Sequence, residues 1–190
     1  NGAPWNYPGT ESVTSLPANV VDWVLVELRQ AATAVNAIDS MSLRAGFLKQ
    51  DGTIVDLDGT PLKFYHTQIT SNLYPVVRHR NHMAIMANNA VAKDGSGTYV
   101  YDFSTGSGQV YGGVAGMKQI DTSPVRWGMV AGDANADNAV YNNDYANYYM
   151  TSFNYVNQYR PADFNLDMNV YNNDYSNFYI PNFNTFNPLP

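Results

Sequence analysis

Two stretches near the C-terminal end of the sequence carry acidic and amide residues at the spacing of a calcium-binding loop. Asp133–Met150 and Asp163–Ile180, thirty residues apart, are identical at eleven of eighteen positions. Ca²⁺ takes six to eight oxygen ligands, which a twelve-residue loop supplies from side chains at positions 1, 3, 5 and 12 and the carbonyl at position 7. We therefore predict two bound calcium ions. The expected ligands are Asp133, Asn135, Asp137, Ala139 and Asp144 in the first loop and Asp163, Asn165, Asp167, Asn169 and Asp174 in the second.

The acidic residues of this region are confined to the two loops. Residues 131–190 contain six Asp, no Glu and a single basic residue, Arg160, and every Asp stands at loop position 1, 5 or 12. Asp and Asn also favour ordinary turns, but turns alone do not place every acid on a ligand position in both copies. Without cations, carboxylates gathered this closely repel one another by an energy on the order of several kcal/mol.

Two loop positions depart from the usual pattern. Position 6, commonly a glycine with positive φ, is Asn138 in the first loop and Met168 in the second. Asn tolerates the left-handed region better than Met does, so the second loop is expected to bind calcium more weakly. Position 9 is Tyr141 and Tyr171, which are too large to replace a short oxygen ligand, so a water molecule is expected there.

Each loop is followed by an aromatic stripe at helical spacing. The stripe consists of Tyr145, Tyr148, Tyr149 and Phe153, and of Tyr175, Phe178 and Tyr179, with Pro181 expected to end the second helix. Two loop–helix units with Asp instead of Glu at position 12 resemble the dockerin modules of bacterial extracellular assemblies, over Gly132 to Ile180. The resemblance implies a cohesin-like partner that contacts Asn142-Asn143 and Asn172-Asn173, although the typical small hydroxyl residues are missing there.

The first 131 residues read as short strands separated by turns. Dense β-branched and aromatic residues at Val20–Arg29 predict a strand buried on both faces, whereas Gln30–Ile38 suits a loop or a single turn. Asp51-Gly52 and Asp58-Gly59-Thr60 are hairpin-type turns. The series predicts a mainly β protein with an Ig-like β-sandwich. The remaining predicted strands are Phe47-Leu48, Thr53–Leu57, Lys63–Tyr65, Leu73–His82 with Met83–Met86, Tyr99–Phe103, Gln109–Tyr111 and Val125–Val130.

A change in composition near Gly132 divides the chain. Fifteen of the twenty-three Asn and nine of the fifteen Tyr fall in the last sixty residues. The expected organisation is an N-terminal extension over residues 1–15, which is a candidate donor strand, a β-sandwich over 16–131, a dockerin-like repeat pair over 132–180 and a tail over 181–190.

Most of the chain carries a further resemblance. Ser15–Arg29, Phe47–Thr60, Val76–Met86 and Trp127–Asp137 are similar to the C-terminal regions of large secreted proteins from environmental Gram-negative bacteria. Those regions pair a β-sandwich with a dockerin-like calcium element and have no known catalytic role. The resemblance implies a secreted protein at the cell surface or in a fibre.

Composition excludes several classes of function. The 190 residues contain no Cys and have a net charge of −6, which excludes disulfides, thiolate metal sites and a Cys nucleophile and argues against nucleic acid as the main partner. No apolar run reaches the roughly 18 residues that a membrane helix needs. The sequence starts at Asn1 without a basic and apolar leader, so a signal peptide is expected to have been removed.

Other candidate chemistry is sparse. The run Arg78–His82 has three interpretations: His79 and His82 as metal ligands, its arginines as an anion site, or a strand whose charged heads pair with acids such as Asp22 or Glu27. We favour the third. There is no Gly-x-Ser-x-Gly elbow and no phosphate-binding Gly-x-x-x-x-Gly-Lys-[Ser/Thr] loop. We therefore expect no catalytic activity.

The sequence thus predicts a non-catalytic, calcium-stabilised extracellular structural subunit that assembles head to tail with copies of itself. The Pro-, Gly- and Asn-rich tails fray unless something holds them, and a neighbouring copy is the simplest holder. The expected contact residues are Trp5, Tyr7, Phe183 and Phe186. One alternative is a docking module with a cohesin-like partner, and another is a carbohydrate-binding module built on the many tyrosines. Asp39-Ser40-Met41 resembles a short bacterial O-glycosylation signal, which makes Ser40 a candidate glycan site.

Overall fold

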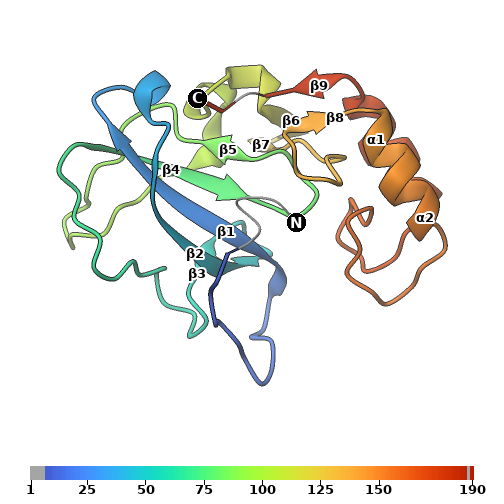
Figure 1. Cartoon of the computed structure of the whole chain (residues 1–190), viewed down its shortest axis with the longest axis horizontal. Helices are drawn as coiled ribbons and strands as arrows, with labels where there is room; N and C mark the ends of the chain where they lie inside the picture. The colour runs from blue at the N-terminus through green and yellow to red at the C-terminus, as the bar shows by residue number, and fades with distance from the viewer. Residues whose placement is uncertain (1–6, 188) are drawn as a thin grey trace.

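The computed structural model describes residues 7–187 and 189–190, and it is mainly β (Figure 1). A curled antiparallel sheet has five strands in the order β3-β2-β1-β4-β5. Their bounds are β1 (Val20–Ala31), β2 (Ser40–Lys49), β3 (Ile54–Val55), β4 (Asn72–Arg78) and β5 (Ile85–Met86). The single turn expected between the first two strands is the 3₁₀ turn η1 (Ala34–Asn36).

The central strand β1 explains why the sheet forms. It pairs with β2 from Val20↔Lys49 to Arg29↔Ser40, and with β4 on its other side. Side chains of β4 and β5 alternate between two buried clusters, because successive residues of a strand point to opposite faces. One cluster contains Val24, Val26, Val77 and Ile85, and the other contains Tyr74, Val76 and Met86. On β1, Val24 and Val26 face the first cluster, and Leu25 on the opposite face is fully buried as well. The strand predicted to be buried on both faces is therefore confirmed.

A hairpin covers one face of the main sheet. It consists of β6 (Met117–Thr122) and β7 (Val125–Met129), and Met117, Trp127 and Met129 pack on the cluster of Val24 and Val26. The 3₁₀ turns η2 (Phe103–Thr105), η3 (Ser107–Gln109) and η4 (Gly113–Ala115) lead into it. The mainly β class is thus what the structure has. The second layer contains two described strands, and the finer prediction of an Ig-like sandwich stays a prediction.

Some strand bounds differ from the sequence prediction. Lys63–Tyr65, Tyr99–Phe103 and Gln109–Tyr111 do not form strands, while β2 begins at Ser40 and β6 is an additional strand. The continuous strand predicted over Leu73–Met86 is instead an antiparallel pair, because β4 ends at Arg78 and the chain turns back into β5. The first half of β2 consists of Ser, Met, Leu, Arg, Ala and Gly residues of modest strand propensity. Its pairing with β1 decides its conformation, since strand preference depends strongly on context.

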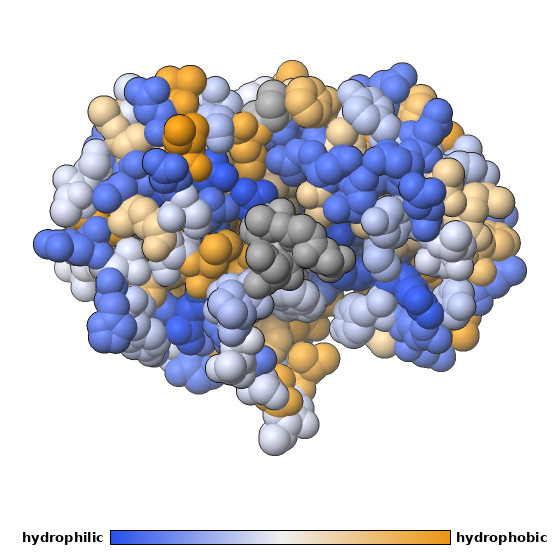
Figure 2. Space-filling view, viewed as in Figure 1, coloured by the Kyte–Doolittle hydropathy of each residue, from blue (hydrophilic) through white to orange (hydrophobic). Residues whose placement is uncertain are grey.

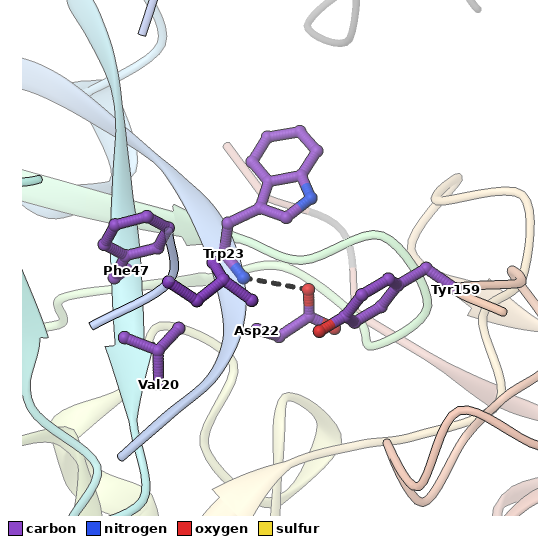
Figure 3. Close-up of a pocket in the computed structure, with 6 residues that line it drawn as sticks. Val20, Asp22, Trp23, Phe47 and Tyr159 are labelled. Atoms are coloured by element: carbon purple, nitrogen blue, oxygen red, sulfur yellow. Dashed lines mark hydrogen bonds between the residues drawn. The ribbon is translucent and has the colours of Figure 1, made fainter. Parts of the chain in front are cut away.

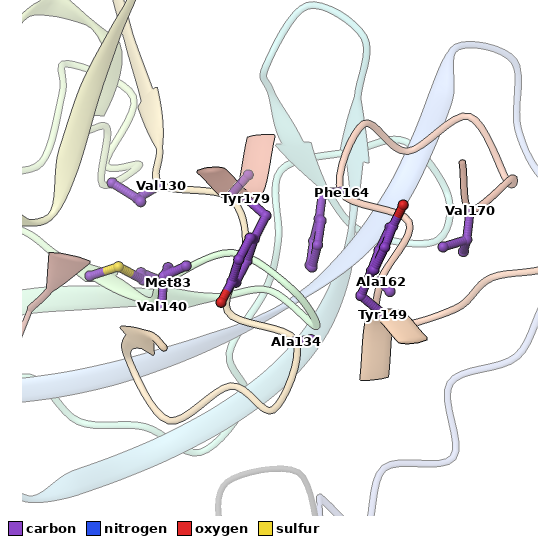
Figure 4. Close-up of a cluster of buried hydrophobic side chains, with 10 residues drawn as sticks. Met83, Val130, Ala134, Val140, Tyr149, Ala162, Phe164, Val170 and Tyr179 are labelled. Carbon is purple, nitrogen blue, oxygen red and sulfur yellow. The ribbon is translucent and has the colours of Figure 1, made fainter. Parts of the chain in front are cut away.

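The repeat region forms the two predicted helical segments. The first runs through α1 (Asn142–Asp144), the π-helical turn η5 (Tyr145–Tyr149) and α2 (Met150–Ser152), and the second through the π-helical turn η6 (Asp174–Tyr179) and the 3₁₀ turn η7 (Ile180–Asn182). Figure 4 shows the rings of Tyr179, Phe164 and Tyr149 standing nearly parallel in one core. Met83 and Val130 belong to the same core, so apolar packing continues across the boundary expected near Gly132.

The two loop–helix units exchange contacts reciprocally. Tyr149 Oη donates to the carbonyl of Tyr171 at 3.3 Å, and Tyr179 Oη donates to the carbonyl of Tyr141 at 3.0 Å. The same exchange holds for the backbone just after each helix. Asn154 N donates to Val170 O, and Asn184 N donates to Val140 O, both at 2.9 Å. Each helix therefore completes the loop of the other unit, and neither unit is whole by itself.

The C-terminal segment runs from the repeat region back to the main sheet (Figure 1). Its strand β9 (Thr185–Phe186) pairs with β8 (Ala139–Val140), which lies inside the first loop. Further along, Arg29 Nη1 donates to Pro190 O at 3.0 Å. The described part of the C-terminal tail is thus held by its own chain, without a neighbouring copy.

Candidate metal centre

The first loop folds around two buried carboxylates. Asp133 and Asp144 are both fully buried. Asp133 Oδ1 accepts a hydrogen bond from Asp137 N at 3.0 Å, and its Oδ2 accepts one from Asn138 N at 2.9 Å. Asp144 Oδ2 accepts one from Tyr141 N at 2.8 Å. The backbone N–H groups therefore hold the side chains of positions 1 and 12 at fixed places inside the loop.

The second loop repeats this geometry. Asp163 and Asp174 are fully buried. Asp163 accepts hydrogen bonds from Asp167 N at 3.0 Å and from Met168 N at 3.2 Å, and Asp174 Oδ2 accepts one from Tyr171 N at 2.9 Å. The two loops predicted from the sequence are thus two copies of one conformation.

Both loops need left-handed backbone at positions 4 and 6. At position 6, φ is 66° for Asn138 and 69° for Met168; at position 4 it is 59° for Ala136 and 64° for Leu166. Met168 therefore adopts the conformation for which it is poorly suited, at a cost of roughly 1–2 kcal/mol for such a residue. The requirement at position 4 has no sequence signal, because neither copy has Gly or Asn there.

Amide side chains close the rim of each loop. Asn135 Nδ2 donates to Asp137 Oδ2 at 2.8 Å, and Asn165 Nδ2 donates to Asp167 Oδ2 at 2.9 Å. Asp137 and Asp167 are exposed, so position 5 marks the entrance. Position 7 lies in β8 as Ala139 in the first loop and is Asn169 in the second. Figure 2 shows hydrophilic residues gathered over the region of β8 and the first loop.

The asparagines at positions 10 and 11 point in different directions. Asn142 and Asn172 are exposed, as a partner contact requires. Asn143 Nδ2 donates to Asp137 Oδ2 at 3.2 Å, and the Oδ1 atoms of Asn143 and Asn173 are buried without a hydrogen-bond partner. Position 11 thus turns part of its amide toward the interior in both copies.

Burial raises the pKa values of the loop carboxyls. Desolvation is the main cause that raises the pKa of Asp133 to about 7 and that of Asp144 to about 6, and the charge of Asp137 contributes to both shifts. Desolvation also raises the pKa values of Asp163 and Asp174. Within the described residues, neither Asp133 nor Asp144 forms an ion pair. A cation inside the loop would supply the missing counter-charge.

The described residues contain no group of three or more His, Cys, Asp or Glu side chains that could hold a metal ion by themselves. A calcium loop also uses amide and backbone carbonyl oxygens, and here the amide N–H groups of Asn135 and Asn165 occupy the carboxylates at position 5. The donor set is of the type that calcium prefers, namely carboxylate, amide and carbonyl oxygens. The rim would have to rearrange around the ion.

The run Arg78–His82 connects the main sheet to the second loop. Arg80 Nε lies 2.9 Å from Asp22 Oδ2 on β1, and Arg80 Nη2 lies 3.2 Å from Asp163 Oδ2. Arg78 Nε pairs with Glu27 Oε2 at 2.8 Å. The predicted pairing of this run with Asp22 and Glu27 is therefore confirmed.

The two histidines of this run belong to the same network. The Nδ1 atoms of His79 and His82 are 3.1 Å apart, and His82 Nδ1 lies 2.8 Å from Asn81 Oδ1. His79 Nε2 lies 3.2 Å from Asp22 Oδ2. Hydrogen bonds connect the two Nδ1 atoms with Asn81, and Asn81 Nδ2 donates onward to the carbonyl of Asp163 at 2.5 Å. His79 Nε2, by contrast, is buried without a hydrogen bond and has Asp22 only as a charged neighbour.

A small hollow of about 80 Å³ lies where β1 meets the repeat region (Figure 3). In Figure 3 the ring of Tyr159 lies beside the Asp22 side chain, while Trp23 points away from it. The hollow has no convergent acid–base pair among its lining residues, which are Leu16, Val20, Asp22, Trp23, Phe47 and Tyr159.

The predicted assembly residues are dispersed. Trp5 lies outside the described residues. Tyr7 Oη donates to Glu11 Oε1 at 2.5 Å. Phe183 packs beside Tyr179, with ring centroids 5.7 Å apart, and Phe186 stands half-exposed on β9. Within the described residues, Tyr7 does not contact Phe183 or Phe186.

No family model, curated protein or solved structure matches this chain. In the part of the chain that the structure describes, no helix is both long and apolar enough to cross a membrane.

Proposed function

We propose that this protein is a non-catalytic, calcium-stabilised structural subunit of an extracellular assembly, with one calcium ion in each loop. The observation that carries the calcium site is the burial of Asp133, Asp144, Asp163 and Asp174 in two loops of one conformation. A buried carboxylate without a counter-charge is costly. In each loop, backbone N–H groups already fix both end carboxylates, while the side chains at positions 3 and 5 bond to each other and must reorient to bind an ion.

Calcium removal tests this proposal. An ion that binds only the folded chain, at a hundredfold excess over its Kd, stabilises it by about 2.7 kcal/mol per site. Chelation should therefore lower the melting temperature markedly. Asp133→Ala together with Asp163→Ala should reproduce the loss and abolish the response to added calcium. An unchanged melting temperature in excess chelator would contradict the proposal.

The finer fold assignments belong to the same proposal. The hairpin β6–β7 packed on one face of the main sheet supports an Ig-like β-sandwich. Two loop–helix units that complete each other through Tyr149 and Tyr179 support a dockerin-like element.

Self-association is the proposed role of the sheet. In the described residues, β3 pairs with the outer edge of β2 only at Phe47 and Leu48, so Ser40–Gly46 has no strand partner on that edge. An extended segment from another copy can add a strand to such an edge. The N-terminal tail is the favoured donor, because the C-terminal tail already pairs as strand β9 with its own chain, whereas residues 7–19 form no strand.

Truncation of the N-terminal tail tests the assembly. The full chain and a chain that begins at Ser15 would be compared by electron microscopy and sedimentation in millimolar calcium. We expect assembly only of the full chain. A full chain that stays monomeric at high concentration would refute the assembly but not the calcium sites.

A docking module is the second candidate. Equivalent positions of the two units expose the same kinds of side chain: Tyr141 and Tyr171 are each 41% exposed, and Met150 and Ile180 are 55% and 49% exposed. Such a duplicated apolar face suits a protein partner. Calcium-dependent binding of a cohesin-type domain, lost in Met150→Asp with Ile180→Asp, would favour this role over self-assembly.

Carbohydrate binding has less support. The rings of Tyr145, Tyr149, Tyr175 and Tyr179 lie 5.1–5.9 Å apart and pack on one another. They are therefore unavailable as an open platform for stacking sugars.

A further inference from the structure

The two loops differ in one charged neighbour. Arg80 Nη2 lies 3.2 Å from Asp163 Oδ2, the position-1 carboxylate of the second loop. In the first loop, no basic side chain among the described residues pairs with Asp133, Asp137 or Asp144. The carboxylates at positions 1 and 12 accept the same backbone hydrogen bonds in both loops.

We propose that Arg80 is a built-in counter-ion of the second loop, which makes this loop the weaker of the two calcium sites and links its occupancy to the main sheet. This inference rests on the calcium function proposed above. It assigns Arg80 as a residue that positions Asp163 and sets the affinity of the site, without itself binding the metal.

The charge balance predicts which of the two loops binds calcium more weakly. Each loop supplies three carboxylates, so the first has a formal charge of −3. Arg80 reduces the charge around the second to −2, because −3 + 1 = −2. The affinity of calcium loops follows the number of charged ligands. An ion in the second loop must also share Asp163 with a guanidinium of like sign to its own, which weakens binding.

Arg80 is anchored on the sheet side and cannot simply turn away. Its Nε lies 2.9 Å from Asp22 Oδ2, its Nη1 donates to the carbonyl of Arg160, and its guanidinium lies over the ring of Tyr159. Asp22 itself is buried on β1. Asp22, Arg80 and Asp163 therefore form one line of charge from the central strand to the second loop.

A different cause for a weak second site must be separated from this one. Met168 holds a left-handed conformation in the second loop where the first loop has Asn138. If backbone strain set the affinity, Met168→Asn would equalise the two sites. If Arg80 sets it, Met168→Asn leaves the order of the sites unchanged.

Calorimetric titration of the full chain with calcium provides the test. Asp137→Ala leaves only the second site and Asp167→Ala leaves only the first, and both changes fall on exposed residues outside any ion pair. We expect the second site to be weaker by about tenfold or more. In the Asp137→Ala chain, Arg80→Met should raise the calcium affinity about tenfold, whereas Arg80→Lys, which keeps the charge, should not.

Equal affinities of the two sites would overturn the inference, and that comparison needs no change at Arg80. An affinity that Arg80→Met lowers or leaves unchanged in a folded chain would overturn it too, as would equalisation by Met168→Asn. Absence of calcium binding in every variant would instead remove the proposed function on which the inference rests.

Discussion

Asp133 is a proposed calcium ligand whose protonation changes near neutral pH. Its carboxyl group is fully buried, and desolvation raises its pKa to about 7, from an ordinary value of 3.8. Two backbone N–H groups favour its charged form, but they do not offset burial and the nearby charges of Asp144 and Asp137. In the calcium-free chain this group therefore holds a proton at pH values where an exposed Asp is fully ionised.

We predict that the calcium-free chain becomes less stable as the pH rises from 5 to 8. The folded chain binds a proton at Asp133 that the unfolded chain releases, so this contribution is fully present below about pH 4 and is lost as the pH rises through about 7. The change should be on the order of 2–4 kcal/mol. Melting in chelator at pH 5, 6.5 and 8 measures it.

Asp133→Asn is the control for this pH dependence, because it removes the titrating group and keeps the shape. The variant should show a flatter profile in chelator. Carboxyls with lowered pKa values, such as Asp22, titrate below this window and do not contribute. A wild-type profile that rises toward pH 8 would refute the assignment.

A second residue-scale prediction concerns the hydroxyl of Tyr179. It donates to the carbonyl of Tyr141 in the first loop, so Tyr179→Phe should destabilise the chain by about 1 kcal/mol. It should also weaken calcium binding at the first site more than at the second. Tyr148→Phe is the matched control, since the Tyr148 hydroxyl has no hydrogen bond to any described residue. Equal effects of the two changes on melting would contradict this role for Tyr179.

At the scale of elements, the packing of the C-terminal segment requires that residue 112 has no side chain. Asn187 is fully buried, and a Cβ on Gly112 would collide with its side chain. Gly112 also has φ of +87°. We predict that Gly112→Ala destabilises the chain by about 1–3 kcal/mol, through strain and overpacking together.

Gly108→Ala is the control for this change, because a Cβ there meets nothing within 4 Å and the residue has no positive φ. Thermal unfolding of the two variants distinguishes them. If both variants melt like the wild type, the packing of Asn187 does not require glycine at position 112.

The elements were predictable from the sequence where local pattern and packing agree. The apolar run of β1, the turns at Gly52 and Gly59 and the two calcium-type loops each follow from residue types at fixed spacing. The first half of β2 was not predictable, because its residues lack strand propensity and only its pairing with β1 orders it. Likewise, no local signal indicated that each helix closes the other loop, since that contact joins residues such as Tyr149 and Tyr171.

At the scale of the whole molecule, several contacts join the repeat region to the main sheet. Arg80 reaches Asp163, the Asn138 side chain accepts a hydrogen bond from Ala84 N at 2.7 Å, and Met83 enters the repeat core. The C-terminal segment adds another connection through β9. Calcium bound in the loops would therefore stabilise the sheet as well as the repeat region.

Removal of residues 185–190 tests this connection. The shortened chain loses the β8–β9 pairing and the Pro190 contact with Arg29, so it should melt earlier and bind calcium more weakly at the first site than at the second. Phe186→Ser keeps the backbone pairing and should change the stability by no more than about 0.5 kcal/mol. A shortened chain with unchanged melting and calcium affinity would refute the connection.

Because each helix completes the loop of the other unit, the direction of protein synthesis determines when each loop can be completed. The carbonyl of Val140 in the first loop accepts a hydrogen bond from Asn184 N. Asn184 is synthesised 44 residues after Val140, since 184 − 140 = 44. At about 5–20 residues per second, synthesis of that stretch takes about 2–9 s. During most of this interval the first loop already contains its three Asp residues but lacks both Asn184 N and the hydroxyl of Tyr179. A chain interrupted between residues 154 and 173 therefore lacks both finished loops rather than one.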